Sequence, residues 1–400
     1  MGLMLVRLLV MARMLDVAAF ADYSAALLVA SAVTMAGSFG LYYKLSRSLP
    51  ILLFHNSENE AAILLAQTIA GSLAVGIVAL SLVPVWSSFS NLSAPLFLAG
   101  FLNGIAQQLF LVVTAVSRSR GRTLDFSIEN LVRSIGIILV IVPIAALVPS
   151  AVTVVVAEAI VSTIISLTIL MRTVPSALRP TFVVAKSAIR QLSSLDWGAI
   201  LALLGVSVVS FLSTNVDRWF ALEILDKAGF AEYAFAWTIM VVALSVQAVV
   251  NASVFPFIAR RYAAYGLDRA WKISAVVSFG MLLACCFVAI PGSIAASYAV
   301  PVLFPKYGGA VALVAPLAIA ASFRMADFWS SFLIIAGLER FALVANIASV
   351  CVGVSGWFLW TGNDGFSAVE MAWLALIIAM LNFVFTAAAS LLCSDRARRG

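Results

Sequence analysis

The sequence predicts an all-α polytopic membrane protein, and its composition carries that prediction. Of the 400 residues, 64% are hydrophobic and 10% are charged, whereas soluble domains average roughly 45 to 50% and about 25%. A helix of about 20 apolar residues spans a bilayer, and charge-free runs of that order recur from one end of the chain to the other. This composition excludes a soluble protein.

Charges, prolines and interfacial aromatic residues divide the chain into predicted spans. We expect these at residues 20–43, 61–86, 95–117, 130–149, 151–171, 197–220, 232–257, 273–293, 310–336, 341–360 and 366–392. A further helix at residues 2–15 would reach only about 21 Å, so we expect a short first helix whose beginning is missing, giving about twelve in all. The alternative is a secretory signal, because a basic apolar start is followed by small residues.

The distribution of basic residues predicts the orientation of the chain in the membrane. With the N-terminus inside, 17 of the 24 Lys and Arg residues fall in inside loops or the C-terminal tail, and the outside loops hold only Lys227 and Lys306. Basic residues of short loops stay on the cytoplasmic side, so both termini are expected in the cytoplasm. The same charge predicts contact with anionic membrane lipid rather than with nucleic acid.

An internal repeat predicts two parallel halves. DVAAFADY at 16–23 recurs as DKAGFAEY at 226–233, each before a long apolar helix. Six spans separate the copies, so both halves enter the membrane in the same sense. We therefore expect a six-helix lobe at 1–171, a cytoplasmic linker at 172–196, a second six-helix lobe at 197–392 and a basic cytoplasmic tail at 393–400. The alternative is chance similarity between two Ala-rich junctions.

Three stretches, at 16–47, 215–237 and 302–322, resemble the polysaccharide or O-antigen flippases of the Wzx or PST type. These belong to the multidrug/oligosaccharidyl-lipid/polysaccharide exporter superfamily. Within the third stretch, the family's Phe-Gly-Pro-Glu-Tyr element is present only as Phe304, Pro305, Lys306 and Tyr307. The missing Gly, and a basic residue where the family has an acidic one, are departures from the family pattern.

The resemblance implies translocation of undecaprenyl-pyrophosphate-linked oligosaccharide repeat units across the bacterial cytoplasmic (inner) membrane, by alternating access, for surface polysaccharide or O-antigen biosynthesis. It implies a lipid-linked oligosaccharide as partner, possible contact with polysaccharide polymerase machinery, and no cofactor. One alternative is a multidrug or small-molecule antiporter of the same superfamily, and a second is a polysaccharide polymerase or ligase.

Arginines inside predicted spans are candidate cavity cations for such a substrate. An ionisable side chain at the centre of a transmembrane helix costs about 2.5 to 3.5 kcal/mol, so each one needs a reason. Arg324 lies at the middle of span 310–336, with Asp327 at i+3 as its expected partner. Arg133 follows Glu129 by one turn. Each arginine either binds the pyrophosphate through its planar fork or belongs to a structural pair.

The first helix supplies a third candidate cation, and span 151–171 a lone carboxylate. Arg7 and Arg13 lie on nearly opposite faces of the first helix, so at most one of them points into a cavity. Glu158 stands alone in its apolar span. An unpaired buried carboxylate could exchange a proton, so we expect Glu158 and Asp327 to act in coupling or gating. A silent interhelical hydrogen bond is the alternative for Glu158.

Uncharged polar pairs at i and i+4 are the remaining site candidates. They are Asn103 with Gln107, and Gln247 with Asn251. Each pair makes one polar stripe on its helix. The stripes predict either a lining for sugar hydroxyls or interhelical hydrogen bonds.

The enzyme alternative is weakened by the absence of chemistry-bearing clusters in the sequence. Polymerases and ligases resemble proteins with a long outer loop of acidic, His or Arg groups, whereas the longest outer segment here, about 294–309, holds one charge, Lys306. The sole His55 lies in an inner loop, so neither a metal cluster nor a Ser/His/Asp set is expected. No P-loop pattern occurs, which excludes an ATP-driven pump within this chain. We therefore expect a protein that is not an enzyme and has no metal site.

The predicted orientation is testable with reporter fusions. A fusion that ends after Arg261 should be active only as a cytoplasmic reporter, and one that ends after Lys227 only as an external reporter, because basic loops stay inside. Paired alkaline phosphatase and green fluorescent protein fusions measure this. The same side for both sites would contradict the topology.

Overall fold

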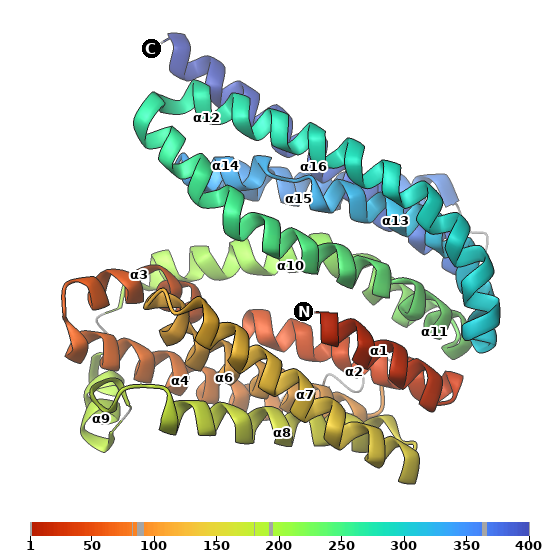
Figure 1. Cartoon of the computed structure of the whole chain (residues 1–400), viewed down its shortest axis with the longest axis horizontal. Coiled ribbons are helices and arrows are strands. Elements are labelled where there is room, and N and C mark those ends of the chain that lie inside the picture. The colour runs from red at the N-terminus through yellow and green to blue at the C-terminus, as the bar shows by residue number, and fades with distance from the viewer. Residues whose placement is uncertain are drawn as a thin grey trace. The chain divides into compact units, whose positions relative to one another are not determined.

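The computed structural model describes residues 2–81, 83–85, 92–179, 181–191, 195–361 and 366–399. These residues form helices and connecting turns, with no strand among them (Figure 1). In the first half of the chain the helices are α1 (Gly2–Met14), α2 (Val17–Ala36), α3 (Leu41–Phe54), α4 (Glu58–Ser81), α6 (Ala94–Ser119), α7 (Thr123–Leu147), α8 (Ala151–Arg172), the 3₁₀ turn η1 (Ser176–Leu178) and α9 (Phe182–Arg190). They continue with α10 (Trp197–Ile224), α11 (Lys227–Ala236), α12 (Thr238–Leu303), the 3₁₀ segment η3 (Pro305–Ala310), α13 (Val311–Met325), α14 (Trp329–Ile335), α15 (Glu339–Thr361) and α16 (Ala368–Arg399).

The predicted all-α polytopic membrane protein is confirmed. Within the described residues, ten helical segments are long and apolar enough to cross a membrane. The first helix is short, as expected, since α1 has 13 residues. The chain is therefore a multi-pass membrane protein.

The chain divides into two compact units, Leu3–Val208 and Val209–Gly400, and the boundary falls inside α10. The segment 172–196, predicted as a linker, contains η1 and α9, and both pack against α4 of the first unit. The predicted lobe and linker boundaries stay a prediction.

The first unit is built around α6, which packs most closely against α2 and α8. Glycines at positions 100 and 104 allow the close approach of α6 to α2. A Cβ at Gly100 would lie 2.5 Å from the carbonyl oxygen of Ala26, and one at Gly104 would lie 2.6 Å from Cβ of Val33. At the same contact the hydroxyl of Thr34 donates to the carbonyl of Gly104 over 3.2 Å. Small residues that let two backbones meet are typical of helix packing in membranes.

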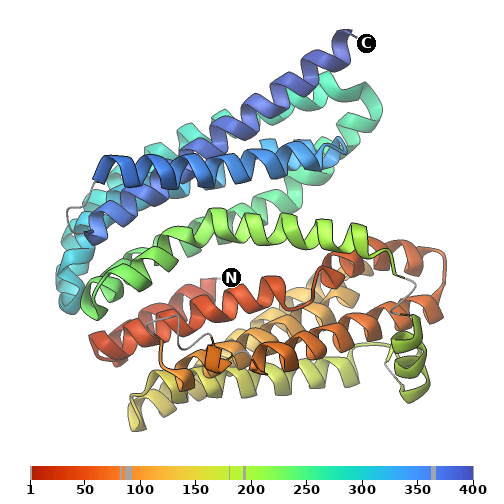
Figure 2. The same ribbon diagram turned by 180° about the vertical axis from the view of Figure 1, so that it is seen from behind.

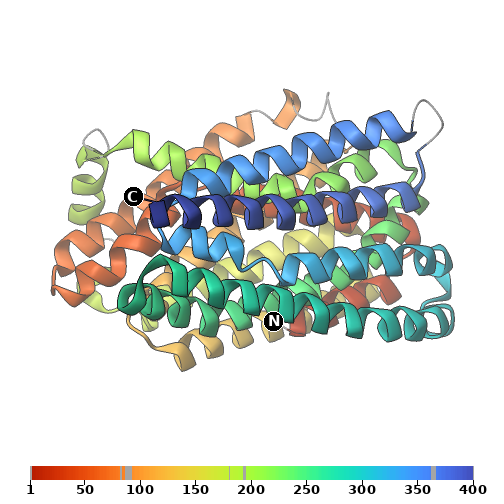
Figure 3. The same ribbon diagram turned by 90° about the horizontal axis from the view of Figure 1, so that it is seen from above.

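The second unit is organised by α12, whose 66 residues fold back on themselves. Gly266 lies inside this element with φ of 74° and ψ of −174°, a non-helical conformation that glycine adopts easily. The bend separates α12 into two limbs, visible in Figure 1. The helix α13 packs against α12 and α16, and α15 lies beside α16 (Figures 2 and 3).

The two copies of the repeated octapeptide have the same local structure. Asp16 and Asp226 are the N-cap residues of α2 and α11, and each side chain accepts a hydrogen bond from the backbone N–H three residues on, over 2.6 and 2.8 Å. Such caps satisfy an N–H that lacks a helical partner. The repeat therefore marks two equivalent helix starts.

The aromatic residues of the repeat are also equivalent. Phe20 and Phe230 are buried in their units, and so are Tyr23 and Tyr233. Each tyrosine hydroxyl donates to a buried carboxylate. The octapeptide is therefore a packing and capping element in both units.

Three predicted spans are interrupted, the one at 232–257 by Trp237 alone, which separates α11 from α12. The span expected at 20–43 was wrong in its extent, because α2 ends at Ala36 and α3 begins at Leu41. Gly40 has φ of 83°, and a Cβ there would lie 2.4 Å from the carbonyl oxygen of Ile200, so a glycine permits both the turn and the contact. The span expected at 310–336 is divided between α13 and α14.

The segment predicted as the longest outer segment, 294–309, is largely helical. Its residues are helical to Leu303, and η3 follows. Within η3 the Tyr307 ring stacks on Phe235 at 4.7 Å, and the N–H of Gly309 donates to Glu232 over 3.2 Å. These contacts tie η3 to α11.

The close approach of α6 to α2 predicts opposite effects for two Gly→Ala changes. Gly100→Ala should lower the melting temperature of the purified protein, because overpacking costs about 1 to 3 kcal/mol. The matched control is Gly280→Ala in α12, where a Cβ would meet nothing within 4 Å. That variant should melt at the wild-type temperature or higher, since Ala favours helix over Gly by about 1 kcal/mol. Equal melting of the two variants would contradict the packing.

Candidate functional site

A buried cluster in the first unit is centred on Glu158. The carboxylate of Glu158, on α8, forms an ion pair with Arg7 of α1, with 2.9 Å between Nη1 and Oε2. It also accepts hydrogen bonds from the Tyr23 hydroxyl over 2.6 Å and from the Asn103 amide over 3.2 Å. Four helices, α1, α2, α6 and α8, each supply one member of this cluster. The interactions satisfy a carboxylate that is fully buried.

A second arginine, on α7, bonds to a residue of α8 one turn away from Glu158. The Nε of Arg133, on α7, donates to the Ser162 hydroxyl over 2.9 Å, and its guanidinium lies 4.6 Å from the Phe110 ring centroid. Ser162 is four residues after Glu158, on the same buried face of α8. Among the described residues, no ion pair forms with Arg133 and no acceptor is bonded to its two terminal nitrogens. Its positive charge is therefore uncompensated by a direct partner.

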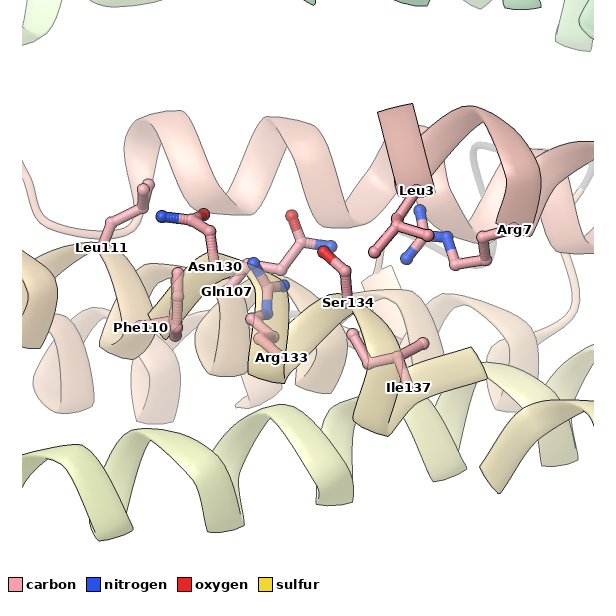
Figure 4. Close-up of a pocket in the computed structure, with 9 residues that line it drawn as sticks. All are labelled: Leu3, Arg7, Gln107, Phe110, Leu111, Asn130, Arg133, Ser134 and Ile137. Atoms are coloured by element: carbon pink, nitrogen blue, oxygen red, sulfur yellow. The ribbon is translucent and has the colours of Figure 1, made fainter. Parts of the chain in front are cut away.

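The two arginines line one cavity of about 210 Å³. Figure 4 shows Arg7 and Arg133 reaching the same space from α1 and α7. The lining residues are Leu3, Arg7, Gln107, Phe110, Leu111, Asn130, Arg133, Ser134 and Ile137. The cavity thus combines two guanidinium groups, two amides and a hydroxyl with apolar walls. Such a lining suits a ligand that has both an anionic group and an apolar part.

The structure brings together five of the residues predicted as a site. Arg7, Arg133, Asn103, Gln107 and Glu158 all lie in this cluster or its cavity. The amide of Gln107 lies 3.5 Å from the side-chain oxygen of Asn103, so the expected polar stripe on α6 is present. The substrate-binding and coupling roles of these residues stay predictions.

The expectation that only one arginine of the first helix faces inward is confirmed. Arg7 is buried, whereas Arg13 is exposed. The expectation that Glu158 is unpaired was wrong, because Arg7 reaches it from a helix 151 residues away in sequence. Sequence spacing gives no sign of so distant a partner.

The expected pairing of Arg133 with the residue one turn earlier was also wrong. Glu129 instead accepts a hydrogen bond from the Ser117 hydroxyl of α6, over 2.8 Å. Arg133 is directed to α8 by Ser162. The two side chains therefore bind different helices.

Sequence reasoning missed Tyr23 and Ser162. Tyr23 is the last residue of the first repeat copy, so the recurrence of a tyrosine there was the signal that could have identified it. Ser162 stands at i+4 from Glu158, a spacing that places the two residues on one helix face. Small residues continue this face at Ser166, which is also fully buried.

The second unit holds Arg324, which does not pair with Asp327 as expected. Both residues are described, and no ion pair joins them. Arg324 is instead in the last turn of α13, where its guanidinium donates to the backbone carbonyl and the hydroxyl of Ser213 on α10. A basic residue near a helix C-terminus interacts favourably with the helix dipole. Arg324 therefore lies at a helix break rather than in the middle of a continuous helix.

The same break explains the surroundings of Asp327. Its carboxylate accepts from the backbone N–H and the hydroxyl of Ser330, over 3.2 and 2.7 Å, and so satisfies a backbone N–H in the first turn of α14. It also accepts from Asn382 over 3.3 Å and from Thr386 over 3.1 Å, both on α16. A side chain that bonds local backbone competes with helix continuation. Asp327 thus connects the first turn of α14 to α16.

Of the second predicted polar pair, Gln247 belongs to this break. Its amide donates to the backbone carbonyl of Arg324 over 2.6 Å, which satisfies a carbonyl at the end of α13. The side chain of Asn251 lies outside the described residues.

A tyrosine–carboxylate pair occurs in the second unit as well. Tyr233 donates its hydroxyl to Asp217 of α10. The adjacent Arg218 donates to Asn215 over 3.2 Å, and its guanidinium lies 4.1 Å from the Trp237 ring centroid. In each unit, therefore, the tyrosine that ends the repeat binds a buried carboxylate that lies near an arginine.

Comparison with solved structures identifies the fold. The chain is similar to an inward-facing multidrug resistance MATE family transporter of the MOP superfamily, with a TM-score of 0.72, 14% identity, and coverage of 97% of this chain and 94% of that chain. A Vibrio cholerae MATE transporter gives a TM-score of 0.67 at 14% identity, covering 100% of this chain and 93% of that chain. A eukaryotic MATE transporter gives 0.64 at 10% identity, covering 99% and 96%.

The chain therefore has the fold of MATE transporters, in which 12 transmembrane helices form two lobes, as the sequence predicts. At 10 to 14% identity this likeness shows the fold alone and does not separate flippases from multidrug transporters. No protein-family model matches the chain, and no curated protein is similar to it in sequence.

The buried ion pair between Arg7 and Glu158 predicts that a second substitution can restore the stability lost through the first. Glu158→Gln should lower the melting temperature strongly, because breaking a buried pair costs about 3 to 5 kcal/mol. Combining it with Arg7→Met should restore most of the loss, since no uncompensated charge is left. Glu339→Gln, at an exposed acidic position of α15, is the control and should melt as wild type. If the double variant melts no higher than Glu158→Gln alone, the pair does not have this role.

Proposed function

We propose that this protein is an alternating-access transporter whose substrate is an anionic amphiphile. The observation that carries the proposal is the cavity of the first unit, where Arg133 has no ion-pair partner among the described residues. Arg7 is neutralised by Glu158, so the lining keeps one net positive charge. A charge in a membrane-spanning segment is costly, and a substrate anion would offset that cost.

The chemistry of the cavity further supports a phosphate-bearing substrate with a polar chain. The free terminal nitrogens of Arg133 form a fork that suits phosphate oxygens. The amides of Gln107 and Asn130 and the hydroxyl of Ser134 line the same cavity and could bond to sugar hydroxyls. We therefore propose a lipid-linked oligosaccharide on an undecaprenyl pyrophosphate carrier, moved across the bacterial inner membrane with both protein termini in the cytoplasm.

The second unit supplies a further candidate cation for this substrate. Arg324 is buried and has no ion pair among the described residues. Its bonds to Ser213 occupy part of the guanidinium, and its Nε has no hydrogen-bond partner. Asp327 and Glu158 are proposed as coupling or gating groups, because each carboxylate joins helices that could move relative to one another.

A multidrug antiporter is the second candidate function. The fold supports it as well as it supports a flippase, because the similar structures include multidrug resistance transporters. Organic cations require carboxylates in the cavity. Glu158 would have to leave Arg7 to serve that role, which makes this candidate depend on breaking the ion pair.

Arg133→Gln tests the proposed function. In cells that depend on this protein, the change should lower export of surface polysaccharide about tenfold or more, with lipid-linked intermediate accumulating, because bonds to a charged group contribute about 1.5 to 3 kcal/mol. Arg133→Lys keeps the charge but loses the fork, so it should be intermediate. Arg13→Gln, an exposed change on α1, controls for charge loss.

The same cells distinguish the two candidates. Normal export by Arg133→Gln at normal protein level contradicts the flippase proposal. Resistance to cationic compounds that is lost in Glu158→Gln and kept in Arg133→Gln would favour the multidrug antiporter.

A further inference from the structure

Two adjoining hollows lie at the bend of α12, in the second unit. The first, here called the basic hollow, measures about 480 Å³ and is lined by Arg261, Tyr265, Asp268, Arg269 and Lys272. The second, here called the apolar hollow, measures about 410 Å³ and is lined by Phe257, Arg261, Arg269, Lys272, Ile273, Val276 and Val277. Three basic residues are common to both linings. The hollows therefore form one continuous site with a cationic and an apolar end.

The backbone of Gly266 creates this arrangement. Its non-helical conformation turns the chain between the two limbs of α12. Arg261 precedes the turn, and Arg269 and Lys272 follow it, so the fold-back brings cations of both limbs to one place. A Cβ at Gly266 would meet nothing within 4 Å, and its positive φ is what requires glycine.

The cations of this site are not neutralised by ion pairs. Among the described residues, no salt bridge involves Arg261, Arg269 or Lys272. The one carboxylate in the lining, Asp268, accepts a hydrogen bond from the Ser394 hydroxyl over 3.1 Å. Three cations against one carboxylate leave two net positive charges.

Aromatic contacts hold one of these cations in place. The guanidinium of Arg261 lies 5.4 Å from the ring centroids of both Phe257 and Tyr265. Cation–π contacts of this kind orient the guanidinium. Its planar group is thus preset at the junction of the two hollows, where it lines both.

The apolar hollow opens on a surface that faces the hydrocarbon of the membrane. Five of its lining residues, from Arg269 to Val277, lie on the segment Ala264–Leu303, a candidate span in which 11% of an 18-residue apolar window is buried inside the protein. Val276, on this segment, is 74% exposed. Apolar side chains this exposed on a membrane-crossing helix contact acyl chains.

We propose that the basic and apolar hollows together bind one anionic phospholipid of the cytoplasmic leaflet. Its phosphate lies among Arg261, Arg269 and Lys272, and an acyl chain follows Ile273 and Val276 along the helix. Charge complementarity identifies this occupant, because two uncompensated positive charges at a membrane surface attract anionic lipid. The proposal does not depend on the transported substrate.

The apolar end decides between a lipid and other anions. A soluble phosphate would use the cations and leave Ile273 and Val276 without a role. An acidic protein would bind above the membrane surface and would not require an apolar hollow on the span itself. A phospholipid satisfies both ends of the site with one molecule.

Native mass spectrometry of the detergent-purified full chain, titrated with phosphatidylglycerol or with phosphatidylcholine of the same acyl chains, tests the proposal. The wild type should bind phosphatidylglycerol at least about tenfold more tightly than phosphatidylcholine. Each basic residue near an anionic lipid contributes roughly a fivefold factor, so the double variant Arg269→Gln/Lys272→Gln should bind phosphatidylglycerol about 25-fold more weakly. Its phosphatidylcholine binding should not change.

The matched control removes the same charges elsewhere. Arg172→Gln/Lys186→Gln also replaces one exposed Arg and one exposed Lys, but in the first unit and outside both hollows. This variant should keep wild-type lipid binding, and both double variants should melt at the wild-type temperature in detergent without added lipid.

Three results would overturn the proposal. They are an equal loss of phosphatidylglycerol binding in the control variant, undiminished binding in Arg269→Gln/Lys272→Gln, and displacement of the lipid by glycerol phosphate at the concentration at which the lipid itself binds. The second result would show that the lipid binds without these two cations, and the third would leave a soluble phosphate as the occupant.

Discussion

The buried ion pair between Arg7 and Glu158 is the constraint on which the first unit depends. A charged side chain in hydrocarbon is expensive, and two of opposite sign become tolerable only when they meet and their remaining hydrogen-bonding groups are satisfied. Tyr23 and Asn103 supply those further bonds to the carboxylate. These bonds connect four helices at Glu158. The positions of α1 and α6 in turn determine part of the wall of the neighbouring cavity.

The composition and periodicity of the sequence predict most of the fold, because hydrophobic length alone determines which segments enter a membrane. They fail where a single residue interrupts an apolar run. Gly40 and Asp327 both stand at helix breaks inside segments that are continuous by hydropathy. Gly40 turns the chain with a positive φ before α3, and the Asp327 side chain accepts a hydrogen bond from a backbone N–H in the first turn of α14. Neither effect is visible to a measure of mean hydropathy.

The sequence predicts which residues belong to the candidate site, but it does not predict which of them bind one another. Ionisable residues inside spans are few, so Arg7, Arg133 and Glu158 stand out in the sequence. Their partners depend on which helices become neighbours. Local spacing suggested Glu129 for Arg133 and Asp327 for Arg324, yet both arginines instead bind other helices. In a helical membrane protein the partner of a buried charge comes more readily from a neighbouring helix, because the interhelical contact is where hydrocarbon is excluded.

The equivalent tyrosines of the two repeats differ in the time between their own synthesis and the synthesis of the carboxylate that each one bonds. Tyr233 and Asp217 are separated by 16 residues, so this pair can form as soon as α10 and α11 have both been inserted. Tyr23 and Glu158 are separated by 135 residues, and Arg7 waits still longer in sequence, for a partner 151 residues away. At about 5 to 20 residues per second, the first two helices spend on the order of ten seconds in the membrane before α8 arrives. The second unit forms its polar contact between neighbouring helices, whereas in the first unit Arg7 has no carboxylate partner until α8 is made.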